Sequence, residues 1–314
     1  MIDRRVFLQL TGAMTTALAI SPPLFAKSST SISKREIPST GERVGVIGFG
    51  NSPAFSSDTA SEFGQEFVTE RDKTVRALVE AFKVRGGNLI DASYGSIVNL
   101  SEYLPREELD TTRFVTSPFN VFGEHVATRE HIEKLISILR KKPLDMLQLR
   151  SALTTDTTEA YWPLMKEWKA EGLVRHIGPS GQGPKHADVM VEVMSDGADF
   201  VHVDYSLFSQ HVEEVVLPAA LDTGTAVFVM QPFKSGEIFR LTAGRELPDW
   251  VSEFDCESWA QFALKWIVSH PAITSVFMET TKTRHVVDNM GAGIGRLPDA
   301  DQRERMLALI KSWT

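Results

Sequence analysis

Apolar runs of strand length alternate with amphipathic stretches along most of the chain. In the stretch 74–87, for example, apolar residues recur three and four positions apart and a Gly–Gly pair follows, which predicts a helix and its end. The apolar runs lie at 43–50, 88–93, 113–119, 144–150, 174–180, 200–206, 226–233 and 273–280. The helical patterns lie at 74–87, 100–109, 128–142 (behind a Thr128 cap), 157–172, 184–196, 212–222, 258–269, 282–293 and 299–313.

This regular alternation predicts an α/β protein with a parallel sheet, because parallel neighbours need crossover helices. Eight strand–helix units in roughly 280 residues favour a closed (β/α)8 TIM barrel over an open doubly wound sheet. No GxGxxG follows the first strand, which weakens a dinucleotide-binding Rossmann reading. In such a barrel, functional residues are expected at the C-terminal ends of the strands.

Composition and charge narrow the class of protein. The chain is 42% hydrophobic and 24% charged, which is typical of a globular protein, and its net charge of −8 argues against a nucleic-acid surface. Cys256 is the only cysteine, so the chain forms no internal disulfide. No sequence spacing typical of metal ligands occurs, and we therefore expect no metal site.

The N-terminus has the pattern of an export signal. Arg4 and Arg5 precede an apolar run that ends near Ile20, and the small residue Ala26 follows a proline-containing break. This resembles a twin-arginine signal peptide, and the run is too short and too rich in small residues for a membrane-spanning helix.

The signal predicts three segments and a location. We expect a signal peptide at 1–26, a linker at 27–35 and a barrel at 36–314. The mature protein would then reach the periplasm through the twin-arginine export machinery, already folded and with its cofactor, and would keep no stable membrane anchor after cleavage.

Several phrases resemble the aldo/keto reductase family, in particular its exported members. They are REIPSTGERVGVIGFG, GGNLIDASYGS, LDMLQL, WKAEGLVRHIGPS, LKWIVSHPAITSVF and HVVDNMGA, and they run in register from about residue 36 to 292. The resemblance implies reduction of a carbonyl with NADPH, with a tyrosine hydroxyl as proton donor. In the family, a lysine paired with an aspartate lowers the pKa of that tyrosine from about 10, and a histidine orients the carbonyl.

The family's catalytic residues are only partly matched. Asp91 matches the family aspartate, and Tyr94 matches the tyrosine but follows the aspartate by three residues where the family pattern has five. Pro118 stands where the family has its lysine, and Arg150 stands where the family has its histidine. One hypothesis is that Arg150 pairs with Asp91 and lowers the pKa of Tyr94. The alternative is an Arg–Asp pair with a structural role alone.

The resemblance also implies contacts to the nicotinamide. Ser180 matches a family serine that binds the carboxamide, although it could equally be a turn residue after the fifth strand. His202 stands where the family has a glutamine, and it can donate or accept one hydrogen bond. The aromatic residue that stacks on the ring is replaced near Met230.

A phosphate site is expected at the start of the last barrel helix. Thr280 or Thr281 is predicted to cap this helix, whose N-terminal amides favour an anion. Lys282, Arg284 and Asn289 fall at or near family positions that bind the 2′-phosphate of NADPH, which favours NADP(H) over NAD(H). The alternative is a capped surface helix with solvated charges.

Two main functions and one further option remain open at this point. The first is an exported NADPH-dependent oxidoreductase that acts on a small-molecule aldehyde or ketone. The second is a catalytically inactive barrel that works in the periplasm as a binding or scaffold protein, since both the lysine and the histidine are replaced. A third, weaker option is a changed reaction in which Arg150 binds a substrate carboxylate.

Overall fold

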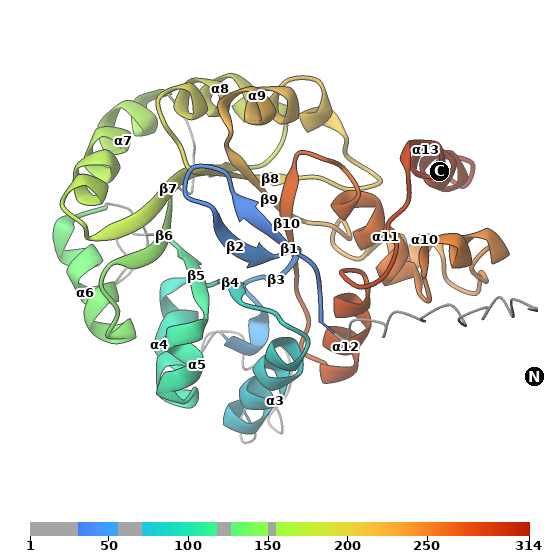
Figure 1. The fold of residues 1–314 in the computed structure, drawn as a ribbon, viewed down its shortest axis with the longest axis horizontal. Coiled ribbons are helices and arrows are strands. Elements are labelled where there is room, and N and C mark those ends of the chain that lie inside the picture. Colours follow the sequence, from blue (N-terminus) through green and yellow to red (C-terminus); the bar gives the residue numbers. More distant parts are fainter. Residues whose placement is uncertain (1–30, 56–70, 118–126, 150–154) are drawn as a thin grey trace, which may run out of the picture.

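The protein folds into a closed barrel of parallel strands surrounded by helices (Figure 1). The computed structural model describes residues 31–55, 71–117, 127–149 and 155–314. Within these ranges eight strands close the barrel, and every neighbouring pair is parallel. In spatial order they are β3 (Ile47–Phe49), β4 (Leu89–Asp91), β5 (Arg113–Thr116), β6 (Leu144–Leu149), β7 (Val174–Gly181), β8 (Phe200–Asp204), β9 (Ala226–Met230) and β10 (Ile273–Met278). The predicted (β/α)8 fold is confirmed.

Helices follow the strands and form the outer ring (Figure 1). They are α3 (Arg71–Val84), α4 (Tyr94–Tyr103), α5 (Arg106–Thr111), α6 (Arg129–Leu139), α7 (Thr155–Ala170), α8 (Ala187–Ser195), α9 (Val216–Thr223), α10 (Glu237–Leu241), α11 (Trp259–Val268), α12 (Thr283–Gly291) and α13 (Ala300–Lys311). The expected cap of α6 is confirmed, because the hydroxyl of Thr128 accepts a hydrogen bond from the His131 amide at 3.3 Å.

The first apolar run differs from the prediction of a single strand at 43–50. Its first part belongs to β2 (Glu42–Gly45), which pairs antiparallel with β1 (Lys34–Ile37), and only its second part is barrel strand β3. Gly41 makes the reversal between β1 and β2 possible with a left-handed φ of 71°. β1 begins two residues before the expected start of the barrel at 36, so the end of the expected linker is part of a strand.

The β1–β2 hairpin covers one end of the barrel, and Figure 1 shows it across the barrel centre. Ile37 and Val44 of the hairpin belong to the same buried apolar cluster as the inward side chains of the strands. Phe200 and Phe228 stack in that interior with ring centroids 5.2 Å apart. Because their strands start at this end, the hairpin closes the N-terminal end and leaves the C-terminal end as the mouth.

The helical pattern at 100–109 is also divided. The structure has two helices there, α4 and α5, because Leu104 precedes Pro105 and takes an extended conformation with φ −94° and ψ 142°. α4 begins at Tyr94, six residues earlier than the predicted pattern. Tyr94, which lies between the predicted strand 88–93 and the predicted helix 100–109, is therefore the first residue of a helix.

Candidate active site at the barrel mouth

Four side chains from alternate strands form one layer inside the barrel near its C-terminal end. We call them the mouth layer: Asp91 (β4), Gln148 (β6), His202 (β8) and Phe277 (β10). Such four-residue layers from alternate strands are usual in TIM barrels, but they are commonly apolar. Here three members are polar, and their exposed fractions are only 6%, 1% and 2%.

Hydrogen bonds connect the polar members of the mouth layer across three strands. The side-chain amide of Gln148 donates from Nε2 to Asp91 Oδ1 at 2.9 Å. The other end of the same amide, Oε1, lies 3.0 Å from Nδ1 of His202. The His202 ring packs against the Phe277 ring with centroids 5.0 Å apart. Gln148 therefore bridges two residues that lie 111 positions apart (202 − 91) in the chain.

Ser180 lies next to the mouth layer on β7. It is the register partner of His202 on β8, and it is buried with 4% exposure. The structure therefore brings together two residues, Ser180 and His202, that the sequence assigns to the nicotinamide. Met230 ends β9 near the same rim, and its sulfur accepts a hydrogen bond from Gln182 Nε2 at 3.2 Å.

Tyr94 is held at the mouth by the start of α4. Ser93 caps this helix, and its hydroxyl accepts a hydrogen bond from the Ser96 amide at 3.4 Å. Asn51, just after β3, anchors the cap: its Oδ1 accepts from the Ser93 amide at 3.1 Å and from the Ser96 hydroxyl at 2.7 Å. Tyr94 is half-buried and packs against the main core. The short Asp91–Tyr94 spacing is thus accommodated by an immediate strand-to-helix transition.

The predicted cap of α12 is wrong. The N-cap residue is Lys282, and no side chain caps the helix. The Thr280 hydroxyl instead accepts a hydrogen bond from the amide of Lys282 at 3.1 Å, before the first helical residue, Thr283. Thr281 is half-buried. The Thr280 carbonyl accepts a hydrogen bond from the Ser52 hydroxyl at 2.8 Å, which ties this segment to the end of β3.

The three phosphate candidates on this segment have different surroundings. Lys282 and Arg284 are exposed at the start of α12, whereas Asn289 is 4% exposed and faces the core. The structure therefore keeps two of the three at one surface. Glu279, just before them, packs against Gly50 at the end of β3: a Cβ atom on Gly50 would stand 2.6 Å from the Glu279 Cγ, so a larger residue there would displace the Glu279 side chain.

A segment that the sequence reasoning missed follows β9. Gln231, Lys234 and Ser235 all take left-handed conformations, with φ of 57°, 46° and 51°, and Gly236 follows with φ 81°. Each such non-glycine residue costs on the order of 1–3 kcal/mol, and strain of this kind concentrates at ligand-binding loops. The sequence signal was the Pro232–Gly236 spacing at a strand end, which marks an irregular loop without revealing its strain.

Two residues of the predicted catalytic arrangement lie outside the described residues. They are Arg150, the proposed substitute for the family histidine, and Pro118, at the position of the family lysine. In the part of the chain that the structure describes, no group of three His, Cys, Asp or Glu side chains could hold a metal ion. In that same part, no helix has the length and apolar character needed to cross a membrane.

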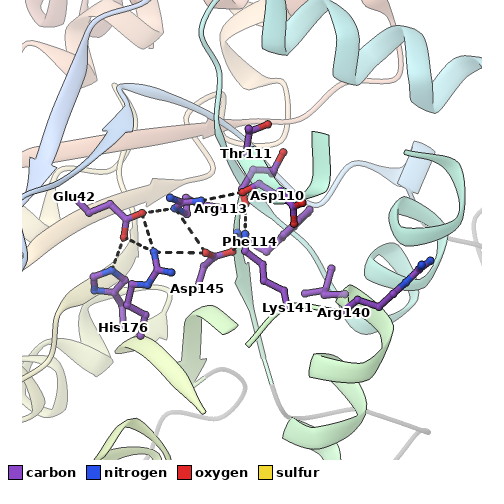
Figure 2. A network of polar contacts seen from close by, with 12 residues as sticks. Glu42, Asp110, Thr111, Arg113, Phe114, Arg140, Lys141, Asp145 and His176 are labelled. Atoms are coloured by element: carbon purple, nitrogen blue, oxygen red, sulfur yellow. Dashed lines mark hydrogen bonds and ion pairs between the residues drawn. The ribbon is translucent and has the colours of Figure 1, made fainter. Parts of the chain in front are cut away.

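A second polar cluster lies at the opposite, N-terminal end of the barrel (Figure 2). We call it the basal network: Glu42 (β2), Arg113 (β5), Asp145 (β6), Arg175 and His176 (β7). Glu42 is its centre, since its carboxylate pairs with Arg113, with Arg175 at 3.2 Å and with His176 Nε2 at 2.9 Å. Arg113 also lies 3.7 Å from Asp145.

Contacts at this end of the barrel shift the pKa of Glu42 and His176 and of the neighbouring Asp199 (β7–β8 connection). Hydrogen bonding to His176, together with the neighbouring guanidinium groups, holds the pKa of Glu42 well below its usual range. Burial works to lower the pKa of His176, but the hydrogen bond to Glu42 and the negative charge of Asp199, 3.9 Å from Nδ1, outweigh it and raise that pKa. Burial likewise opposes ionisation of Asp199, yet contacts from His176 and Lys169 lower its pKa to about 2. These charges hold the hairpin in place.

Comparison with known proteins gives one family. The sequence profile described as "Aldo/keto reductase family" matches residues 59–306. No curated protein is significantly similar to the chain.

Solved structures share the fold at low sequence identity. An aldo-keto reductase from Klebsiella pneumoniae in complex with NADPH is 19% identical, with a TM-score of 0.63 over 89% of this chain and 95% of that one. An aldo/keto reductase from Klebsiella pneumoniae in complex with NADP and acetate is also 19% identical, with a TM-score of 0.63 over 89% of this chain and 96% of that one. The aldo-keto reductase AKR11C1 from Bacillus halodurans (holo form) is 18% identical, with a TM-score of 0.66 over 89% of this chain and 96% of that one.

Proposed function

The chain belongs to the aldo/keto reductase family, and we therefore propose that it is an NADP(H)-dependent oxidoreductase that reduces the carbonyl of an aldehyde or ketone. The observation that carries the proposal is the buried Asp91 in the mouth layer, on the strand that leads directly into the helix bearing Tyr94. Catalytic residues of this fold lie at the C-terminal end of the strands, so an acidic side chain buried there favours a role in chemistry.

The described residues fit the cofactor at two places. Ser180 and His202 are adjacent at the ends of β7 and β8 and would bind the nicotinamide carboxamide. Lys282 and Arg284 are exposed beside the uncapped amides of α12 and would bind the 2′-phosphate, since a helix N-terminus attracts anions. The bound cofactor supplies the hydride. The solved relatives from Klebsiella pneumoniae in complex with NADPH or NADP support this assignment.

The chain's own residues would position and protonate the substrate. The Tyr94 hydroxyl would donate a proton to the carbonyl oxygen, and the Asn51–Ser93 anchor would hold it in place. Asp91 would supply a fixed negative charge, and Arg150 would supply the positive charge that a tyrosine with a pKa near 10 needs to act at neutral pH. In this proposal Pro118 and Arg150 replace the lysine and histidine that the family resemblance implies.

The second candidate is a catalytically inactive barrel that binds a ligand or partner. Two replacements in the sequence favour it: Pro118 stands at the position of the family lysine and Arg150 at the position of the family histidine.

Titration of the purified mature protein with NADPH, followed by quenching of intrinsic tryptophan fluorescence, tests the proposed function. The chain has 6 tryptophans, so a signal is available. Saturable binding together with carbonyl-dependent oxidation of NADPH is the expected result. Absence of binding at millimolar NADPH rejects the reductase assignment, and binding without turnover favours the inactive barrel.

We further propose that residues 1–26 are a twin-arginine signal and that the mature protein works in the periplasm. Exchange of Arg4 and Arg5 for lysine should leave the protein in the cytoplasmic fraction, because this export route reads the arginine pair. Asp3→Asn, a neighbouring change that keeps the pair, should be exported normally. Equal export of both variants would contradict the proposal.

A further inference from the structure

We propose that Gln148 is a positioning residue that locks His202 in one tautomer, with the proton on Nδ1. Gln148 touches Asp91 at one end of its amide and His202 at the other, at 2.9 and 3.0 Å. Nothing in the sequence around it, LDMLQL, suggests a role beyond an apolar strand. Only closure of the barrel puts the three side chains in contact.

The direction of the amide follows from the hydrogen-bonding inventory. An ionised carboxylate only accepts hydrogen bonds, so the NH2 group of Gln148 must face Asp91. Its carbonyl oxygen, Oε1, then faces His202 and can only accept. Nδ1 of His202 must therefore carry a proton. The opposite orientation of the amide would place two acceptors against each other, at Asp91, in a buried site.

Packing opposes rotation of the Gln148 amide. All three polar side chains are at least nine-tenths buried, so water cannot easily replace either hydrogen bond. The His202 ring is also held by the Phe277 ring at 5.0 Å. A buried donor or acceptor that loses its partner costs about 1–3 kcal/mol, which opposes rotation of the amide or the ring.

The consequence concerns what His202 can bind. A neutral imidazole protonated on Nδ1 has its lone pair on Nε2, so Nε2 accepts and does not donate. A ligand group that meets it must be a hydrogen-bond donor. This step rests on the proposed function: if His202 binds the nicotinamide carboxamide, it binds the NH2 group and leaves the carbonyl oxygen to another residue.

Nitrogen-15 NMR of the imidazole side chains tests the tautomer without any cofactor. Two-bond correlations between ring protons and ring nitrogens distinguish Nδ1–H, Nε2–H and the doubly protonated ring, and His202→Gln identifies the signal among the 8 histidines. We expect the Nδ1–H pattern for His202 at neutral pH. The Nε2–H pattern or the doubly protonated pattern would overturn the proposal.

Two variants sharpen the test. Asp91→Asn keeps the shape of the side chain but can both accept from and donate to the Gln148 amide. The orientation of that amide is then no longer fixed, and His202 should show both neutral tautomers. Gln148→Met keeps the volume and removes both hydrogen bonds, so His202 should lose its single tautomer. If both variants fold and His202 still gives the wild-type pattern, Gln148 does not set the tautomer.

Asp204→Asn is the matched control. Asp204 is a buried aspartate at the end of β8 and lies 3.5 Å from His211 Nε2. Its replacement should change the His211 signals and leave those of His202 unchanged. A change at His202 of the size seen in Asp91→Asn would show that any buried aspartate of the mouth affects it, and would overturn the proposal.

The outcome is separable from that of the proposed function. The tautomer is read in the protein alone, whereas reductase function is read by NADPH titration and turnover. If the protein shows the expected tautomers but binds no NADPH, the role of Gln148 stands and the reductase function is rejected. If it binds and oxidises NADPH but His202 shows the other tautomer, the reductase function stands and the role of Gln148 is rejected.

Discussion

The two ends of the barrel solve the problem of buried polar groups in different ways. The basal network places opposite charges against each other, with Glu42 between Arg113, Arg175 and His176. In the mouth layer, the amide of Gln148 instead connects the Asp91 carboxylate to the His202 imidazole through two hydrogen bonds. The charges of the basal network stabilise the hairpin that closes the barrel, whereas the hydrogen bonds of the mouth layer fix the orientation of its side chains.

The comparison also shows that a strongly shifted pKa does not by itself mark function in this protein. The lowered pKa values of Glu42 and Asp199 and the raised pKa of His176 belong to the closed, N-terminal end of the barrel. Catalysis in this fold takes place at the other end. Here, perturbed ionisation reflects a structural ion-pair network, which is the known exception to its use as a functional marker.

Replacing Tyr94 should have the largest effect on turnover. Tyr94→Phe removes the proposed proton donor and should lower turnover by about 10²–10⁴-fold, the usual contribution of a general acid, with little change in thermal stability. Tyr103→Phe at the other end of α4 is the matched control and should retain activity. Stopped assays of NADPH oxidation measure both. Equal turnover of Tyr94→Phe and wild type would remove Tyr94 from the mechanism.

Replacing Glu42 should affect stability and leave the chemistry unchanged. Glu42→Gln leaves Arg113, Arg175 and His176 without their central anion, and breaking a buried ion pair costs about 3–5 kcal/mol of folding free energy. We expect about 3 kcal/mol, the lower end, because the Glu42 side chain is 16% exposed and partly screened. Urea unfolding measures the loss, and Glu36→Gln, on the exposed side of the same hairpin, is the control. A loss below about 0.5 kcal/mol would show that the basal network is not what holds the hairpin.

Replacing Gln148 should affect both the stability of the protein and its affinity for NADPH. Gln148→Met leaves buried polar atoms of Asp91 and His202 without this partner and should lower the free energy of unfolding by about 1–3 kcal/mol. It should also weaken NADPH binding, because His202 loses its fixed orientation. A stability loss with unchanged NADPH affinity would assign Gln148 to stability alone.

The pH dependence of stability should report the basal network. The pKa of His176 is raised in the folded protein, so its contribution is fully present below the unfolded pKa of about 6.5 and is lost as pH rises through the folded value. Thermal unfolding followed from pH 6 to 9 should therefore show a decline that is absent in His176→Gln. An identical slope in both proteins would mean that another group titrates.

At acidic pH the change of stability with pH has the opposite direction, since stability falls as the pH falls. The pKa of Asp199 is lowered to about 2, so its contribution is present above its unfolded pKa of about 3.9 and is lost as pH falls toward 2. Asp199→Asn should reduce the loss of stability between pH 4 and pH 2, a range that spans those two pKa values. Retention of the full acid-induced loss in that variant would assign it to other carboxylates.

Local pattern alone determined the architecture. Strand and helix signals alternate regularly, and parallel strands joined by helices have few ways to close, so the barrel and its functional end could be predicted. The capping residue Thr128 was predictable for the same reason, since its hydrogen bond is local. The positions of Asp91 and Tyr94 near the mouth also follow from the order of elements.

Tertiary structure decided what periodicity cannot encode. The run 43–50 reads as one strand whether or not the chain reverses before it, so the hairpin was invisible in the sequence. The predicted cap of α12 was wrong because the N-cap residue is Lys282, two residues after Thr280 and one after Thr281. Gln148 is a single amide in an apolar strand, and its role exists only because the closed barrel brings positions 91, 148 and 202 into hydrogen-bonding contact. Contacts between distant positions depend on the register and closure of the sheet, which no short stretch of sequence specifies.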